Sequence, residues 1–163
     1  MRPAGAAAPT AAPAASLCEP SRLATAEGGS ESYACSFSPA QGVRLHWSSH
    51  ADSSASLALQ REGAGGWLAL GFPERPGRMA PAGALVALSN GTLATYLLRG
   101  YSVRSVTPCA RAGMPVSYSA ASSSTTPEGT VLRVSGLRIT SAGELPLLYA
   151  RHTGEAFPAY HGP

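Results

Sequence analysis

The sequence predicts an all-β fold, an antiparallel β-sandwich, from three features. Gly, Pro, Ser and Asn punctuate the chain about every 8–12 residues, the spacing of short strands joined by turns. Helical periodicity is almost absent, whereas several short segments alternate between apolar and polar residues. Charged residues make up only 13% of the chain, beside 18 Gly and 14 Pro, a composition typical of turn-rich β-proteins. We expect a disordered Ala/Pro-rich segment over residues 1–16 and one domain over residues 17–163.

The expected strands follow one another from residue 43 onward. In VRLHW, the apolar residues Val43, Leu45 and Trp47 share one face. His46 therefore faces the other way, on the surface or in a groove. Further strands are expected at SLALQR (56–61), GWLALGF (66–72), ALVAL (84–88), TLATYLL (92–98), MPVSYSA (114–120), TVLRVSGLRI (130–139) and LPLLYAR (145–151), with a polar loop at SAASSSTTPEGT (119–130). About eight to ten strands at this spacing indicate an immunoglobulin-like β-sandwich.

Two of these segments carry additional signals. GWLALGF is apolar on both sides, as expected of a central strand or of one that lies against a ligand. Asn90-Gly91 divides two apolar runs, and Asn-Gly is the strongest short-range signal for a hairpin turn. Asn90-Gly91-Thr92 is also an N-glycosylation sequon, so Asn90 is a candidate glycosylation site at an exposed hairpin tip.

The three cysteines fit an oxidising compartment better than a metal site. None of them forms a Cys-x-x-Cys pair, the spacing of zinc and thioredoxin-like sites. Cys18 and Cys35 would close a short loop at the start of the domain, so we expect a disulfide between them. Cys109 is then left over, either as a small buried apolar residue or as the replacement for one member of that pair.

Composition and motifs argue against several functional classes. The formal net charge is +3 and all 12 basic residues are arginines, but they are scattered and form no basic stripe for nucleic acid. No metalloprotease, serine-hydrolase, dinucleotide or phosphate-loop motif is present, which argues against a catalytic function. No apolar run approaches the about 18 residues of a membrane span, and the start of the chain is a poor signal-peptide core. For a domain outside the cytoplasm, an export signal is expected upstream, or the chain is a fragment.

One methionine, Met79, lies in a loop rich in proline and arginine, FPERPGRMAP (72–81), between apolar runs. Such a methionine either fills an irregular space or offers a soft thioether ligand to haem iron or copper. The candidate imidazole ligands are His46, His50, His152 and His161, and their surroundings do not single one out. The residues alone leave both roles of the methionine open.

Several short motifs follow one another in a characteristic order. The cysteine pair is followed by LHW, by GGWLALGFPERPGRMAPAGALVAL (65–88), by NGTLATYLLRGYS (90–102) and by LYARHTGEAFPAYH (148–161). This order resembles the DOMON domain, in particular the haem-b-binding kind related to the cytochrome domain of cellobiose dehydrogenase and to plant auxin-induced DOMON proteins. The family's motif positions are filled here by Trp67, Gly71, Phe72, Met79, Gly83, Tyr96, Gly100, Tyr101, Ser102, Tyr149, Gly154, Pro158 and His161. The resemblance covers about residues 17–161 and implies a β-sandwich that holds one haem b.

The resemblance implies a ligand pair for the haem iron. Met79 and His161 match the family's axial ligands, and His161 completes a Pro-x-x-His pattern with Pro158. His152 is the fallback for the histidine. With both axial positions filled by protein atoms, such a haem passes single electrons and has no open site for a substrate.

The resemblance also implies surroundings and partners. Trp67 and Phe72 are expected to contribute to the haem-binding wall, and Arg78 or Arg75 to pair with a propionate. The implied partner is a redox partner, either a transmembrane b-type cytochrome or an ascorbate-linked donor. The implied location is the extracellular or lumenal face, with membrane tethering through a missing continuation.

A different class of function, a cofactor-free β-sandwich that binds a sugar or a protein, is the alternative. In that case exposed aromatic residues would make the contacts, because their flat faces stack on a ligand. Tyr33, Trp47 and Tyr160 are the candidates for this role.

Overall fold

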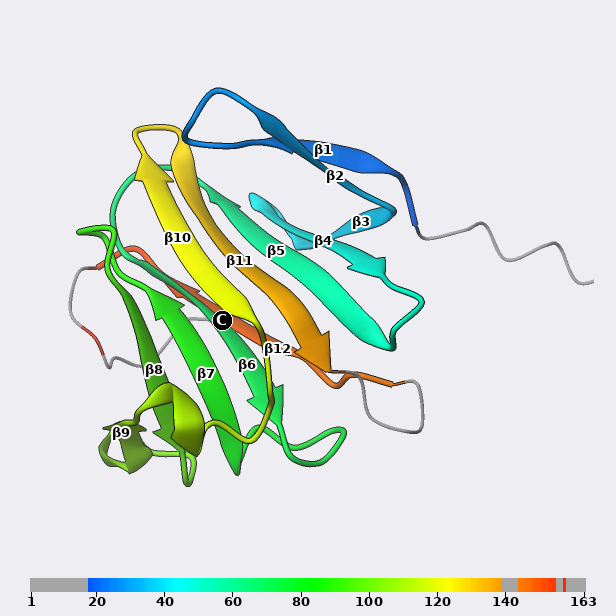
Figure 1. The fold of residues 1–163 in the computed structure, drawn as a ribbon. Helices are drawn as coiled ribbons and strands as arrows, with labels where there is room; N and C mark the ends of the chain where they lie inside the picture. The colour runs from blue at the N-terminus through cyan, green and yellow to red at the C-terminus, as the bar shows by residue number, and fades with distance from the viewer. Residues whose placement is uncertain (1–17, 139–143, 155–156, 158–163) are drawn as a thin grey trace, which may run out of the picture.

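The computed structural model describes residues 18–138, 144–154 and 157 and confirms the all-β class (Figure 1). Within these residues the chain forms twelve short strands and two short 3-10 helices. The strands are β1 (Ser21–Ala24), β2 (Ser30–Tyr33), β3 (Cys35–Ala40), β4 (Val43–Ser49), β5 (Ser54–Glu62), β6 (Trp67–Pro73), β7 (Ala82–Ala87), β8 (Leu93–Leu98), β9 (Val106–Pro108), β10 (Ala120–Thr126), β11 (Gly129–Arg138) and β12 (Leu148–His152), and the helices are η1 (Val103–Ser105) and η2 (Arg111–Gly113). Neither helix in the described ranges has the length or apolar character needed to cross a membrane.

Two five-stranded antiparallel sheets pack face to face in a sandwich-like arrangement (Figure 1). The first sheet has the strand order β10-β11-β5-β4-β3, and the second has the order β12-β6-β7-β8-β9. Both sheets contribute buried side chains to the main core between them: Leu57, Leu59, Leu132 and Val134 from the first sheet, and Leu68, Leu70, Phe72 and Leu85 from the second. Because side chains alternate along a strand, each sheet also has an outer face, and both outer faces are partly covered.

The outer face of the first sheet is covered by the hairpin of β1 and β2, which buries His46 (Figure 1). His46 is only 2% exposed, and its Nδ1 and Nε2 atoms lie 2.7 Å from Ser21 Oγ and 3.3 Å from Gln60 Oε1. Its ring packs against Tyr33, with ring centroids 5.6 Å apart. The prediction of a surface or groove histidine is therefore wrong, because two strands in residues 21–33, which the sequence pattern does not reveal, cover this face.

The predicted disulfide between Cys18 and Cys35 is present, with their Cα atoms 4.8 Å apart. It joins the segment before β1 to the first residue of β3, so the β1–β2 hairpin is tied covalently to the first sheet. Cys109 is the free cysteine, half-buried just after β9, and its Sγ lies 3.9 Å from Sδ of Met114. It therefore does not replace either member of the pair.

Two segments differ from the sequence prediction. Residues 114–120 do not form a strand: Met114 and Tyr118 are buried in the main core, but the backbone before Ala120 is irregular. Residues 119–130, expected as a loop, contain β10, which forms a hairpin with β11 through the pairing of Thr126 with Gly129. Because β10 is an edge strand, it keeps polar Ser and Thr side chains that make its sequence look like a loop.

The β7–β8 hairpin turns at Asn90-Gly91, as the sequence predicts. Gly91 has a φ of +80°, the left-handed region that favours glycine. The Thr92 N–H donates to Asn90 Oδ1 at 2.9 Å, which closes the turn. Asn90 is exposed at this tip, and its N-glycosylation stays a prediction.

Candidate functional site

Strands β6 and β7 are buried on both faces along their whole length. The even-numbered residues of β6 face the main core. Its odd-numbered residues, Trp67, Ala69 and Gly71, face outward, where Ala84 and Val86 of β7 lie opposite Gly71 and Ala69. The outer face of the second sheet is therefore apolar too, although it has no covering sheet among the described residues.

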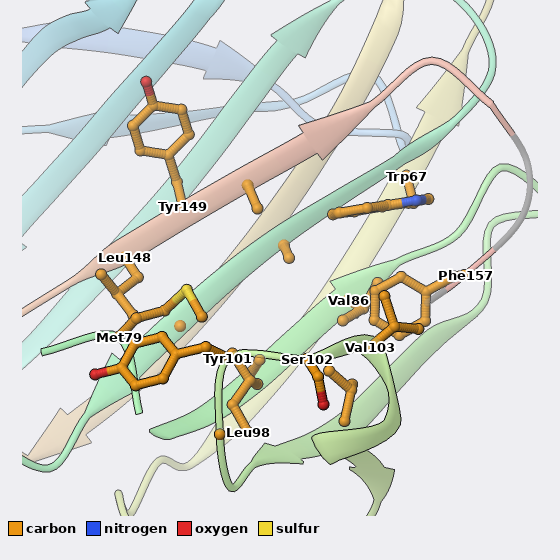
Figure 2. A pocket seen from close by; sticks show the side chains of 16 residues that line it. Trp67, Met79, Val86, Leu98, Tyr101, Ser102, Val103, Leu148, Tyr149 and Phe157 are labelled. Atoms are coloured by element: carbon orange, nitrogen blue, oxygen red, sulfur yellow. The ribbon is translucent and has the colours of Figure 1, made fainter. Parts of the chain in front are cut away.

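A pocket of about 300 Å³ opens on this outer face (Figure 2). Its floor consists of small side chains from neighbouring strands, Ala69, Gly71 and Ala84. Larger apolar residues stand around the floor, namely Trp67, Val86, Leu98, Val106, Leu148 and Phe157. The combination gives a depression that is lined almost wholly by apolar groups.

Met79 stands at one end of the pocket, on the loop between β6 and β7. Two backbone hydrogen bonds shape this loop: Glu74 N donates to Pro81 O at 3.0 Å, and Arg78 N donates to Arg75 O at 3.3 Å. The Met79 side chain is half-buried, and Figure 2 shows its thioether pointing into the pocket. The sulfur is thus placed to meet a molecule in the pocket.

Aromatic residues close the opposite end of the pocket (Figure 2). The Phe157 ring meets the rings of Trp67 and Tyr96 edge-on, with centroid distances of 5.0 and 4.7 Å. His152 stacks on Trp67 and does not itself line the pocket. Its Nδ1 atom accepts a hydrogen bond from the Gly154 N–H at 2.8 Å.

The other candidate residues divide into three groups. Phe72 does not line the pocket: it is 1% exposed and packs in the main core, because its position in β6 faces inward. Arg78 and Arg75 are exposed on the Met79 loop and do not line the pocket. His161 lies outside the described residues. Phe157 lines the pocket, and His161 follows it by four residues in the sequence.

Several residues that line the pocket were given no functional role in the sequence-based prediction. Gly100, Tyr101 and Ser102 matched a family motif, and they line the pocket because β8 pairs with β7 beside the Met79 loop. Leu148 lines it because it pairs with Gly71 across β12 and β6. The sequence places Leu148 in an apolar segment that predicts a strand. A local pattern cannot predict, however, that this strand pairs with β6, which is distant in the sequence.

A glycine keeps part of the pocket floor low, and Met79 supplies a sulfur atom at one end of the pocket. An added Cβ at Gly71 would lie 3.2 Å from Leu148 Cβ, so the glycine keeps this part of the floor low. No cluster of three or more His, Cys, Asp or Glu side chains suitable for a metal ion occurs in the described ranges. The thioether of Met79 is a soft ligand, of the kind that haem iron and copper accept.

Of the aromatic residues considered for a cofactor-free binding module, the two in the described part of the chain are buried or half-buried. Tyr33 is 6% exposed and its hydroxyl donates to Glu31 Oε2 at 3.0 Å, and burial together with this carboxylate raises the pKa of Tyr33. Trp47 is half-buried and meets Phe37 edge-on, with ring centroids 5.8 Å apart. Tyr160 lies outside the described residues.

No protein-family model matches the chain, and no curated protein or solved structure matches it. The pocket and the motifs in the sequence are therefore the two kinds of observation that bear on function. The roles given to the motifs come from the resemblance to a family, whereas the pocket is observed without reference to that resemblance.

Proposed function

We propose that this chain is a haem-b-binding electron-transfer domain of the DOMON type, an immunoglobulin-like β-sandwich with Met79 and His161 as the axial ligands. The observation that carries the proposal is the apolar pocket on the outer face of the second sheet, into which the Met79 thioether points. Met114, in contrast, is buried in the main core and exemplifies the gap-filling role.

The shape of the pocket supports a planar ligand. An apolar macrocycle that enters the pocket edge-on would contact the low floor of Ala69, Gly71 and Ala84 with its rim and keep both of its faces open to Met79 and His161. Trp67 and Phe157 would then pack against one edge of the ring. A sugar, by comparison, would leave its hydroxyl groups without partners on this apolar floor, at a cost for each unpaired group.

The ligand atoms support one-electron chemistry. A haem with two protein axial ligands supplies single-electron transfer and offers no coordination site to a substrate. Met79 would hold the reduced form through its neutral sulfur, which disfavours the added charge of the oxidised form. Arg78, exposed one residue before Met79, would pair with an anionic propionate.

The disulfide is compatible with an extracellular or lumenal location, because such bonds persist in oxidising compartments. In that location the domain would exchange electrons with a redox partner, either a transmembrane b-type cytochrome or an ascorbate-linked donor. Its attachment to a membrane through further chain belongs to the same proposal.

Absorption spectroscopy of the protein supplied with haem tests the proposal. The expected spectrum has a strong Soret band and, after reduction, a sharp α band of a six-coordinate low-spin haem. Met79→Leu should alter this spectrum and lower the reduction potential, whereas the matched variant Met114→Leu should change neither. His161→Gln should have an effect comparable to that of Met79→Leu. A protein that stays colourless would refute the proposal and favour the cofactor-free binding module.

A further inference from the structure

Two loops beside the pocket carry the net positive charge of the chain. Residues 74–81 join β6 to β7, and residues 99–105 follow β8. Both loops contribute to the pocket lining, the first through Met79 and the second through residues 100–103. Ala82, the first residue of β7, pairs with Leu98, the last residue of β8, so the two loops lie at the same end of neighbouring strands in the second sheet. We call residues 74–81 and 99–105 the mouth loops.

The charges on the mouth loops are nearly all of one sign. Their charged residues are Arg75, Arg78, Arg99, Arg104 and Glu74, and all five are exposed. In the rest of the sequence eight arginines are balanced by eight Asp and Glu residues, so the formal net charge of +3 resides on these loops. The excess of positive charge is therefore confined to the mouth loops and is not spread over the whole chain.

The guanidinium groups of the mouth loops lack carboxylate partners in the described part of the chain. Elsewhere, Arg133 lies 2.9 Å from Glu31 and Arg44 lies 3.5 Å from Glu19. Pairing two haem propionates with Arg75 and Arg78 would still leave the mouth loops positively charged by about one unit. The unpaired arginines thus create a field that attracts anions with or without a bound haem.

An exposed aromatic residue lies among these arginines. Tyr101 is 64% exposed, the most exposed large aromatic or apolar side chain in the described residues, and it stands between Arg99 and Arg104 in the sequence. Figure 2 shows its ring beside Met79 at the rim of the pocket. Tyrosine and arginine are the residue types enriched where protein surfaces meet. A small anion would instead need donors that converge on one buried point.

We propose that the mouth loops form a docking surface for the acidic face of a protein redox partner, with Tyr101 as the aromatic contact at its centre. The partner would then meet the same edge of the domain from which Met79 reaches into the pocket. This inference rests on the proposed function, because docking at this edge has a purpose only if the pocket holds an electron carrier. Charge complementarity of this kind accelerates encounter and weakens as ionic strength rises.

A first experiment uses the haem-free protein, so it does not depend on haem binding. Hexacyanochromate(III), a paramagnetic trianion, is added to isotope-labelled protein, and amide line broadening is recorded by NMR. Broadening should be confined to the mouth loops, and hexaamminechromium(III), the matched cation, should not produce it. Poly-L-glutamate should displace the anion and restore the signals. Broadening spread over other surfaces would overturn the inference.

Two further outcomes of this experiment would also overturn it. If poly-L-glutamate fails to displace hexacyanochromate(III), the loops bind small anions only and not an acidic protein surface. If the protein binds phosphatidylserine vesicles more tightly than it binds poly-L-glutamate, the loops serve an anionic membrane surface.

A second experiment uses charge-reversal variants of the haem-supplied protein. Arg99→Glu with Arg104→Glu should slow oxidation by hexacyanoferrate(III) about tenfold at low ionic strength and leave the haem spectrum unchanged. Arg22→Glu with Arg44→Glu, on β1 and β4 of the opposite outer face, makes the same change in net charge and should have a much smaller effect. Equal effects of the two pairs would refute the docking surface, whereas the absence of a Soret band would refute haem binding instead.

Discussion

His152 and Trp67 stack face to face across the β12–β6 pair, with ring centroids 5.9 Å apart and planes inclined by 10°. The Gly154 N–H donates to Nδ1 of His152 at 2.8 Å, which fixes the orientation of the ring. His152 thus packs on a residue that lines the pocket without lining it itself, and under the proposed function, in which His161 is the iron ligand, it has this packing role only.

The first prediction separates these two histidines. His152→Ala removes the ring that stacks on Trp67, so the free energy of unfolding should fall by about 0.5–1.5 kcal/mol, the range for an aromatic pair. Urea denaturation of the haem-free protein measures this loss. The spectrum of the haem-supplied variant should keep the wild-type band positions. A shift of the bands as large as that of Met79→Leu would make His152 the ligand.

The second prediction concerns the floor of the pocket. Ala69→Leu adds a branched side chain that projects into the cavity, and haem affinity should fall at least about tenfold, which corresponds to 1.4 kcal/mol. The haem-free protein should lose only about 1 kcal/mol of stability, because the pocket has room for the added atoms. Haem titration followed at the Soret band measures the affinity, and Ala120→Leu on the exposed strand β10 is the control. Unchanged affinity of Ala69→Leu would place the haem elsewhere.

The features that the sequence predicted correctly are those with a local signal. The two-sided apolar run of β6 and the Asn90-Gly91 turn require no knowledge of distant residues. The strands that were missed, β1, β2, β3, β9 and β10, are short or lie at a sheet edge, and their polar residues hide the alternation. The pocket could be predicted only in part, since Met79 stood out by its loop, whereas Leu148 joins the site through pairing of β12 with β6.

The third prediction concerns the disulfide between Cys18 and Cys35, which closes a sequence separation of 17 residues. A loop of this size lowers the entropy of the unfolded chain, and removing the bond should cost about 3 kcal/mol. Urea denaturation of Cys18→Ser with Cys35→Ser measures the loss, and Cys109→Ser, which breaks no disulfide, is the control. A wild-type midpoint that does not change when reductant is added would contradict the prediction.

The fourth prediction concerns acid sensitivity under the β1–β2 hairpin. Burial lowers the pKa of His46 below the value of about 6.5 that a histidine has in an unfolded chain. The Gln60 hydrogen bond opposes this shift, and the charges of Arg44 and Arg133 reinforce it. Below about pH 6.5 the unfolded chain therefore binds the proton more readily than the folded protein does. The stability from neutral His46 should be complete above this pH and should decline as the pH falls toward the lowered pKa.

Urea denaturation between neutral pH and pH 5 measures this decline. His46→Gln keeps a polar side chain in the cluster but removes the titration, so its stability should depend less on pH over the same interval. The variant should also be less stable than the wild type at neutral pH by about 1–3 kcal/mol, the cost of leaving a buried polar group poorly paired. His50→Gln, which alters the exposed histidine after β4, is the matched control and should retain the wild-type pH dependence. The same slope in His46→Gln and the wild type would show that other groups cause the acid sensitivity.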